Sequence, residues 1–271
     1  MKARIDLQGL QLVTDLSRPI DLAIAQDFSD AQPRHFGAPT ADTHPFAVPG
    51  FSGSVAQGAS CNCSVITLIP HCNGTHTECV GHLTKERLDA HRQVPPGLLP
   101  ALLVTIEPVD ANGPESTDPA PQPGDQLITR RALEHNWPAT PLAEPRAIVI
   151  RTLPNDAAKI RRDYTDITPP YLSREAAEFL VARGIEHIVI DLPSIDRAHD
   201  EGRLTAHRIF FGLPRGSTAL NAAQRPGATV TELAFIPNDV TDGLYLLQIQ
   251  VPAIDGDAVP SRPLLYTFER A

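Results

Sequence analysis

Short apolar runs rich in β-branched residues alternate with polar, proline-dotted stretches along this chain of 271 residues. Runs of this composition and length predict strands that are buried in a sheet. The stretch from Cys63 to Ile69 is one such run, and the others lie at residues 10–13, 101–106, 146–152, 185–191, 228–236 and 244–251. Helical patterns are fewer and shorter.

The clearest helical pattern covers residues 172–184. Ser173 is placed to cap its N-terminus, and Gly184 supplies the residue type that most often ends a helix. A second helix is predicted over residues 129–137, and a short polar one over residues 84–90. These helices lie between predicted strands, as in an α/β protein.

The order of these elements indicates one α/β domain. A strand at 146–152, the helix at 172–184 and a strand at 185–191 are spaced as in a crossover between parallel strands. Residues 108–124 contain five prolines and two glycines and predict a surface loop. No repeat, linker or low-complexity segment divides the chain, so we expect a single domain over residues 1–271.

Charge and cysteine usage limit the partners and the compartment. A formal net charge of −9 argues against nucleic acid or an anionic membrane, because both require a basic face. No apolar run approaches membrane-spanning length, and the polar N-terminus lacks the apolar core of a signal peptide. The four cysteines, at positions 61, 63, 72 and 79, lie too close together to staple a domain of this size. We therefore expect a reduced, cytoplasmic protein.

Side chains able to bind a metal are concentrated at residues 71–82, HCNGTHTECVGH. If this stretch is extended after a buried strand, its two-residue period places Cys72, His76, Glu78 and His82 on one side. Thiolate, imidazole and carboxylate are the groups that hold zinc or a similar divalent ion. The alternative is a structural histidine cluster beside a core cysteine, and spacing by itself does not separate the two.

Further ligands must come from elsewhere in the fold. Active sites of α/β proteins lie at the carboxyl ends of strands, and the strand at 185–191 leads into DLPSID at 191–196 and then to His207. Glu232 lies within the next apolar strand, where an unpaired carboxylate is costly to bury. Considered in isolation, His207 is better explained as a helix-cap or exposed histidine, and Glu232 as a solvent-facing edge-strand residue.

In their order along the chain, these segments resemble the cyclase-type family of metal-dependent hydrolases, which includes bacterial kynurenine formamidase and isatin hydrolase. The family signature H-x-G-T-H-x-D-x-P-x-H aligns without a gap with residues 72–82. Its other marks follow over nearly the full chain: DLSRPI at 15–20, VARG ending at 184, DLPSID at 191–196, AHR at 206–208 and EL at 232–233.

The resemblance implies a swivelling β/β/α-like fold, with a mixed sheet and flanking helices, that assembles into a homo-oligomer. It also implies a site for one or two divalent metal ions, with zinc expected and manganese as the alternative. Carried over position by position, the metal ligands are Cys72, His76, Glu78, His207 and Glu232. His82 corresponds to the acid/base of the family.

Three positions depart from the family signature. Cys72 replaces its first histidine, with His71 displaced by one residue; Glu78 replaces an aspartate, and Val80 a proline. Either Cys72 binds the metal as a thiolate, or a bulge in the chain brings in His71 instead. The identity and number of the metals therefore stay open at this point.

The reaction that the resemblance implies is hydrolysis of an aryl formamide or a cyclic amide by metal-activated water, with His82 carrying the proton. Phe36, Phe51 and Trp137 are the candidates for contacting an aromatic substrate, which stays unidentified. One alternative is a non-catalytic metal- or small-molecule-binding protein on the same fold. Another, less favoured, is a cysteine hydrolase that uses Cys72, because a cysteine at a strand end rarely has activating surroundings.

Overall fold

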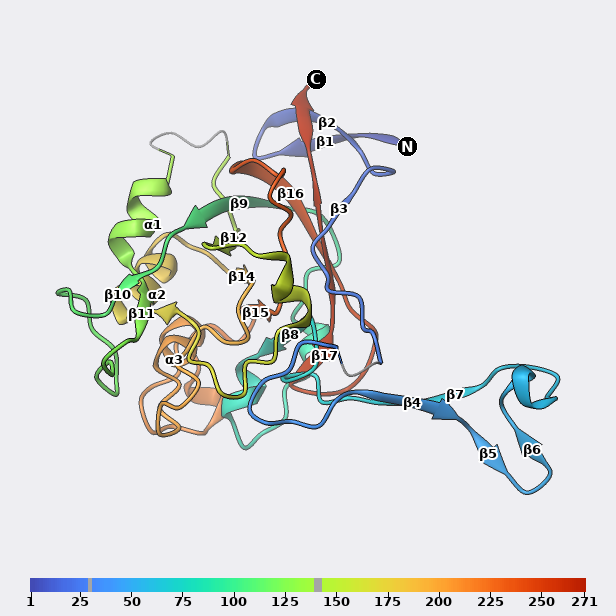
Figure 1. Ribbon diagram of the computed structural model, residues 1–271. Helices are drawn as coiled ribbons and strands as arrows, with labels where there is room; N and C mark the ends of the chain where they lie inside the picture. Colours follow the sequence, from blue (N-terminus) through green and yellow to red (C-terminus); the bar gives the residue numbers. More distant parts are fainter. Residues whose placement is uncertain (29–30, 139–142) are drawn as a thin grey trace.

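A nine-stranded mixed sheet forms the centre of the computed structural model, which describes residues 1–28, 31–138 and 143–271 (Figure 1). Its strands lie in the spatial order β17 (Ala258–Pro260), β8 (His76–Cys79), β15 (Thr229–Glu232), β14 (His187–Ile190), β12 (Ala147–Thr152), β9 (Leu99–Ile106), β16 (Gly243–Gln250), β18 (Arg262–Tyr266) and β3 (Ile20–Asp21). The four strands β9, β12, β14 and β15 are parallel, and the strands on either side pair antiparallel.

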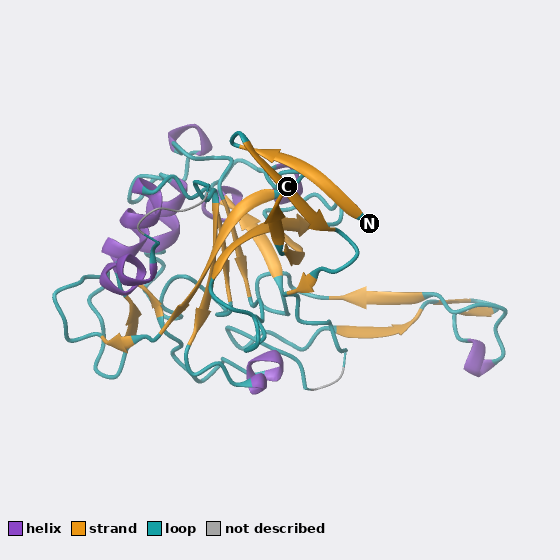
Figure 2. Ribbon diagram, turned by 90° about the horizontal axis from the view of Figure 1, so that it is seen from above, coloured by secondary structure: helices purple, strands orange, loops and turns teal. Residues whose placement is uncertain are grey.

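The central strands are continuous apolar runs because both faces of the sheet are covered. Along β12, Ile148 and Ile150 pack on the face that carries the helices, whereas Val149 points to the opposite core with Leu22. Figure 2 shows the helices gathered on one side of the sheet. They are α1 (Arg130–Asn136), α2 (Arg174–Ala182) and α3 (Thr205–Phe211).

The predicted mixed α/β fold is confirmed, and so are most of its elements. The runs at 10–13, 101–106, 146–152, 185–191, 228–236 and 244–251 each contain a strand, and the predicted helices 129–137 and 172–184 contain α1 and α2. The Ser173 hydroxyl accepts a hydrogen bond from the Ala176 amide at 2.9 Å, and Gly184 has a φ of +72°. Strands β12 and β14, which flank α2 in the chain, pair in parallel as expected.

The expectation of a buried strand at residues 63–69 is wrong. Strand β7 (Ser64–Thr67) pairs with β4 (Asp42–Pro45) in a ribbon that projects from the body, with β5 (Ala47–Val48), β6 (Phe51–Ser52) and the 3-10 helix η1 (Val55–Gln57) at its tip (Figures 1 and 2). We call residues 42–67 the arm. Ile66 on β7 is 57% exposed. An apolar run predicts an extended chain, but it does not determine whether another layer covers that chain.

The short helix expected over residues 84–90 is also absent. That segment follows the 3-10 helix η2 (Val80–Leu83) and runs into a second one, η3 (Ala90–Arg92). Its polar groups bond to a distant segment instead: the Lys85 amide donates to the Thr218 carbonyl, and the Glu86 carboxylate accepts from the Leu220 amide. These tertiary bonds replace the local ones that a helix would make.

The remaining elements are small. The N-terminal stretch contains a hairpin that pairs with the end of the chain. The strands of this three-stranded sheet are β1 (Lys2–Leu7), β2 (Leu10–Asp15) and β19 (Phe268–Arg270). The others are β10 (Val109–Asp110), β11 (Gln126–Ile128), β13 (Tyr171–Leu172) and the 3-10 helices η4 (Ala157–Arg161) and η5 (Leu220–Ala222). Within the described ranges, none of the helices has the length and apolar character needed to cross a bilayer.

Candidate metal centre

The strand pair β8–β15 positions three of the predicted ligands. His76 and Glu78 are two residues apart on β8 and therefore share a face, and the antiparallel register places Glu232 of β15 opposite His76. The His76 Nε2 atom lies 3.4 Å from Glu232 Oε2, and all three side chains are buried. Glu232 is thus not a solvent-facing edge residue, because β15 lies inside the sheet between β8 and β14.

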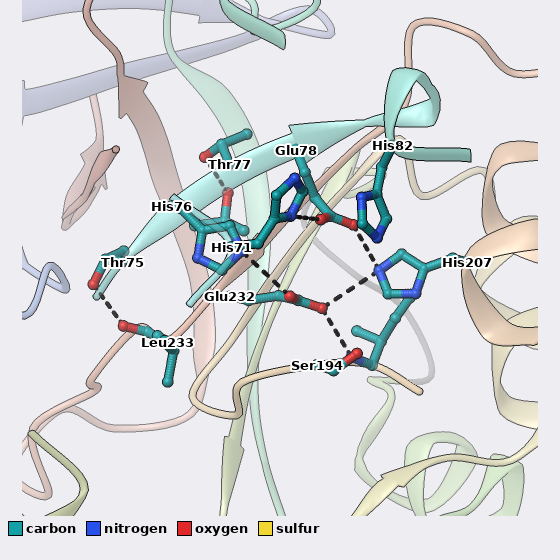
Figure 3. A network of polar contacts seen from close by, with 12 residues as sticks. His71, Thr75, His76, Thr77, Glu78, His82, Ser194, His207, Glu232 and Leu233 are labelled. Atoms are coloured by element: carbon teal, nitrogen blue, oxygen red, sulfur yellow. Dashed lines mark hydrogen bonds and ion pairs between the residues drawn. The ribbon is translucent and has the colours of Figure 1, made fainter. Parts of the chain in front are cut away.

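Helix α3 brings His207 to the same point (Figure 3). The Asp196 carboxylate accepts from the backbone amides of Ala206 and His207 and, at 2.7 Å, from His207 Nδ1. The ring is thereby turned so that its Nε2 lies 2.7 Å from Glu78 Oε1. His207 is fully buried and faces the cluster, which overturns its interpretation as a helix-cap or exposed histidine.

The chain before β8 is a turn and not an extended strand. The amides of Cys72 and Asn73 both donate to the Ile69 carbonyl, so the two-residue period does not extend back to Cys72. The turn instead directs His71 inward, with its Nδ1 2.8 Å from Glu78 Oε2. Among the described residues, three groups place potential ligand atoms close enough together to hold one ion; His71 belongs to two of them and Cys72 to none.

The surroundings of Cys72 also bear on its chemistry. Burial, together with the nearby charge of Glu232, raises the pKa of the Cys72 thiol. A raised pKa disfavours the thiolate, which is the nucleophile that a cysteine hydrolase requires.

His82 lies at the rim of the cluster. It is carried there by the 3-10 helix η2 rather than by an extended strand, and its side chain is 30% exposed. Its ring centroid lies 4.2 Å from that of His71 and 6.0 Å from that of His207. This places a partly accessible imidazole beside the buried groups, where it can meet a bound small molecule.

The structure adds two carboxylates that the sequence pattern did not single out as site residues, Asp196 and Asp257. Asp257 Oδ2 lies 2.8 Å from His71 Nε2 and 3.5 Å from His82 Nδ1. Asp196 lay within the DLPSID segment, but nothing in that segment shows which side chain it contacts. Asp257 precedes β17 in a stretch without any recognisable motif, so no sequence signal identifies it.

Each of the three inner imidazoles has one ring nitrogen held by an outer acceptor. This arrangement is typical of metal-binding histidines, because it fixes the tautomer and orientation of the ring. The pairs are His71 Nε2 with Asp257, His76 Nδ1 with the Gly74 carbonyl at 3.0 Å, and His207 Nδ1 with Asp196. The other nitrogen of each ring is therefore free to face the carboxylates of Glu78 and Glu232.

Three of the inward-facing atoms lie close to opposite groups without being hydrogen-bonded. His207 Nε2 and Glu78 Oε1 are 2.7 Å apart, yet neither has a partner in hydrogen-bonding geometry, and the same holds for His76 Nε2. Buried polar atoms without partners are costly. Nitrogen and oxygen donors that converge in this way fit a divalent metal ion.

The electrostatics of the cluster favour a positive charge beside its carboxylates. Burial alone would raise the pKa of Glu78, but the charges of His207 and His82 hold it well below its usual range. Conversely, burial would lower the pKa of His207, and the charge of Glu78 raises it well above its ordinary value. Without metal, protonated imidazoles compensate the buried carboxylates, which is the role that a bound cation would take over.

Of the three aromatic side chains considered for substrate contact, only Phe36 lies near the cluster. It is 60% exposed and packs edge-on against the ring of His35. Burial lowers the pKa of His35, and the charge of Glu232 partly opposes this shift. Trp137 is buried against Phe179 in the core, and Phe51 lies in the arm.

Comparisons with known proteins agree with this geometry. Residues 14–197 match the family described as "Putative cyclase". A comparison with curated proteins gave no match. Among solved structures, isatin hydrolase A from Labrenzia aggregata bound to benzyl benzoate is similar over 93% of this chain and 94% of its own, with 17% identity and a TM-score of 0.61. A predicted metal-dependent hydrolase from Bacillus stearothermophilus is similar over 92% and 98%, with 16% identity and a TM-score of 0.56. At these identities, the likeness shows a shared fold.

Proposed function

This chain belongs to the cyclase family, and from that membership we propose that it is a metal-dependent hydrolase that cleaves an amide bond. The observation that carries the proposal is the convergence of three oriented imidazoles on two buried carboxylates. The similarity to an isatin hydrolase supports a cyclic amide as the substrate, and an aryl formamide is the second class to be tested.

We assign the metal to His71, His76, Glu78, His207 and Glu232. Cys72, the ligand carried over from the family signature, remains the alternative to His71. A divalent ion held there, zinc or manganese, would polarise the scissile carbonyl and lower the pKa of a water molecule. The protein holds the ligand rings in place through Asp196, Asp257 and the Gly74 carbonyl.

His82 is assigned the proton transfers. Its partly exposed ring can accept the proton that the attacking water loses and then donate it to the nitrogen that leaves as the C–N bond breaks. The products are a carboxylate and an amine. In a cyclic amide, the two groups stay in one molecule.

The test combines metal content with turnover. We expect the purified protein to contain zinc or manganese, measured by inductively coupled plasma mass spectrometry, and to hydrolyse isatin or an N-formyl arylamine. A protein that retains the metal but hydrolyses neither these nor simple cyclic amides would support the metal-binding alternative. Absence of both metal and turnover would contradict the proposal.

Two substitutions separate proton transfer from metal binding. We expect His82→Ala to keep the metal and to lower kcat by about 10²–10⁴-fold, the usual contribution of a positioned acid/base. His76→Ala should lose metal and activity together. A His82→Ala protein that hydrolyses its substrate at the wild-type rate would contradict the assigned role.

We also propose that the protein acts in the cytoplasm on a small molecule, without a nucleic-acid or membrane partner. The four cysteines are free thiols, two of them on the exposed arm, which suits a reducing compartment. The net charge of −9 disfavours polyanionic partners.

A further inference from the structure

We propose that Asp257 is a positioning residue that sets the orientation and tautomer of His82. The inference deepens the proposed function, since it concerns the acid/base of the same site. Asp257 is well placed for this role because its own backbone is fixed. Its carbonyl accepts a hydrogen bond from the Cys79 amide at 3.0 Å, and Ala258, which follows it, pairs with Glu78 across β17 and β8.

A single oxygen of Asp257 contacts two histidines. Oδ2 lies 2.8 Å from His71 Nε2 and 3.5 Å from His82 Nδ1, and the two rings are tilted by only 33° at a centroid distance of 4.2 Å. The two tilted rings each present one nitrogen to the same carboxylate. The longer distance to His82 suits a catalytic contact, because such contacts commonly tighten only when substrate binds.

Glycine at position 81 makes this approach possible. A Cβ atom on Gly81 would lie 3.2 Å from Asp257 Cβ and 2.6 Å from the Leu88 carbonyl oxygen. The contact with the Leu88 carbonyl is closer than a Cβ atom tolerates and involves rigid backbone, and the contact with Asp257 would push that residue away by a few tenths of an ångström. Gly81 immediately precedes His82 in η2, so its missing side chain lets the carboxylate reach the histidine.

For catalysis, the contact with Asp257 determines which ring nitrogen of His82 acts as the base. A carboxylate that accepts the Nδ1 hydrogen favours the tautomer in which Nε2 carries the lone pair. Nε2 is then the atom that takes the proton from water. Without Asp257, a ring that is 30% exposed on a short 3-10 helix is free to turn and to place its hydrogen on either nitrogen.

Kinetics of Asp257→Asn provide the first test, with Asp255→Asn as the matched control. Asp255 lies two residues away, is 59% exposed and pairs with Arg87, outside the cluster. Because Asp257 also holds the ring of His71, the variants are compared with zinc in excess; there we expect Asp257→Asn to lose about 10- to 100-fold in kcat, the usual effect of removing an outer partner, with KM unchanged. Asp257→Glu should recover part of that loss, and the control should behave as wild type.

A double-mutant cycle shows whether the effect passes through His82. In a His82→Ala background, Asp257→Asn should cause no further loss of kcat. Equal losses in both backgrounds would overturn the proposal, because the effect of Asp257 would then pass through His71 and not through His82.

The second test does not depend on turnover. Imidazole ¹⁵N chemical shifts of zinc-loaded protein, assigned with His82→Ala, report the tautomer directly. We expect His82 to carry its hydrogen on Nδ1 in the wild type and to shift toward Nε2 in Asp257→Asn. If the tautomer of His82 were the same in the wild type and in Asp257→Asn, the positioning role would be refuted, even if no amide substrate were found. If only the proposed function were wrong, hydrolysis would be absent but Asp257→Asn would still change the tautomer.

Discussion

Positions 71 and 72 differ in how their side chains leave the same turn, and for this reason we propose His71 and not Cys72 as the metal ligand. The bonds from the Cys72 and Asn73 amides to the Ile69 carbonyl place His71 against Glu78 and leave the Cys72 sulfur outside the clusters formed by the described residues. Burial opposes protonation of His71, but Asp257 and Glu78 outweigh it and raise the pKa of His71 to about 10. In the proposed site a metal ion would have to displace this firmly held proton, so we expect metal binding to weaken at low pH.

We expect His71→Ala to lose most of its metal and Cys72→Ser to retain it. The reason is that His71 is oriented by Asp257 toward Glu78, whereas Cys72 has a raised thiol pKa. The metal content of the two variants after dialysis against a weak chelator tests both expectations. The reverse result would make Cys72 the ligand, as in the alignment with the family signature.

The burial of His187 on β14 predicts how the free energy of unfolding depends on pH. Its side chain is 3% exposed, and burial lowers its pKa from 6.5 to about 4. The folded state therefore favours neutral His187. The contribution of neutral His187 to the free energy of unfolding is fully present above pH 6.5. It is lost as the pH falls from 6.5 toward 4, by roughly 3 kcal/mol at about 1.4 kcal/mol per pH unit.

Urea unfolding of metal-free protein at several pH values between 4 and 7.5 tests this expectation. His187→Gln, which cannot be protonated, should have a flatter profile than the wild type over that interval. If the free energy of unfolding changed equally with pH in the two proteins, groups other than His187 would cause the loss of stability in acid.

Among the elements, the pair β8–β15 determines the site, because its register places the ligands on one face and structural side chains on the other. Thr77 and Thr231 are opposite each other in this register, and their buried hydroxyls hydrogen-bond at 2.7 Å. This bond ties the two strands together directly behind the site. A shift of one residue would move His76, Glu78 and Glu232 away from the cluster.

We expect Thr77→Val to reduce the free energy of unfolding by about 1–3 kcal/mol, because it leaves the Thr231 hydroxyl buried without a partner. The double variant Thr77→Val/Thr231→Val should recover most of this loss, since both polar groups are then replaced by apolar groups of similar shape. Chemical denaturation of the metal-loaded proteins measures both values. Additive losses in the double variant would mean that the hydroxyls do not act as a pair.

For the molecule as a whole, the arm is the feature that the fold of the body does not explain. Its two-stranded ribbon stands away from the main sheet (Figures 1 and 2), and an isolated ribbon is only marginally stable in water. Phe46, Val48, Val55 and Ile66 are all more than 40% exposed on it. Exposed apolar side chains gathered in this way mark an interaction surface. We propose that a second copy of this chain covers the arm in a homo-oligomer.

Light scattering coupled to size-exclusion chromatography tests this assembly. We expect a mass of at least two chains for the wild type and a single chain for Ile66→Asp, which places a charge in the proposed interface. Val109→Asp is the matched control, because Val109 is 47% exposed but lies on β10, away from the arm. A monomeric wild-type protein, or one unaffected by Ile66→Asp, would contradict the proposal.

The main sheet supports the prediction of one domain over residues 1–271. Its strands come from β3, at Ile20–Asp21, through to β18, at Arg262–Tyr266, so both ends of the chain contribute to one sheet. We therefore propose that the chain unfolds cooperatively as a unit. A single thermal transition that coincides by near- and far-ultraviolet circular dichroism is the expected observation.

The sequence by itself determined the features that depend on neighbouring residues. Apolar runs predicted the central strands, and the cap at Ser173 predicted α2, because strand burial patterns and helix capping involve residues a few positions apart. The order of short motifs also indicated His76, Glu78, His207 and Glu232, which the structure brings together.

Only the tertiary structure decided the features that depend on which distant segments meet. Nothing local distinguishes the exposed run of β7 from the buried run of β12, because the difference lies in whether another layer packs on it. The turn that presents His71 instead of Cys72, and the arrival of Asp257 beside it, follow from the pairing of β8 with β15 and β17. Register between strands far apart in the chain is set by packing and hydrogen bonding across the whole sheet, and no short stretch of sequence contains it.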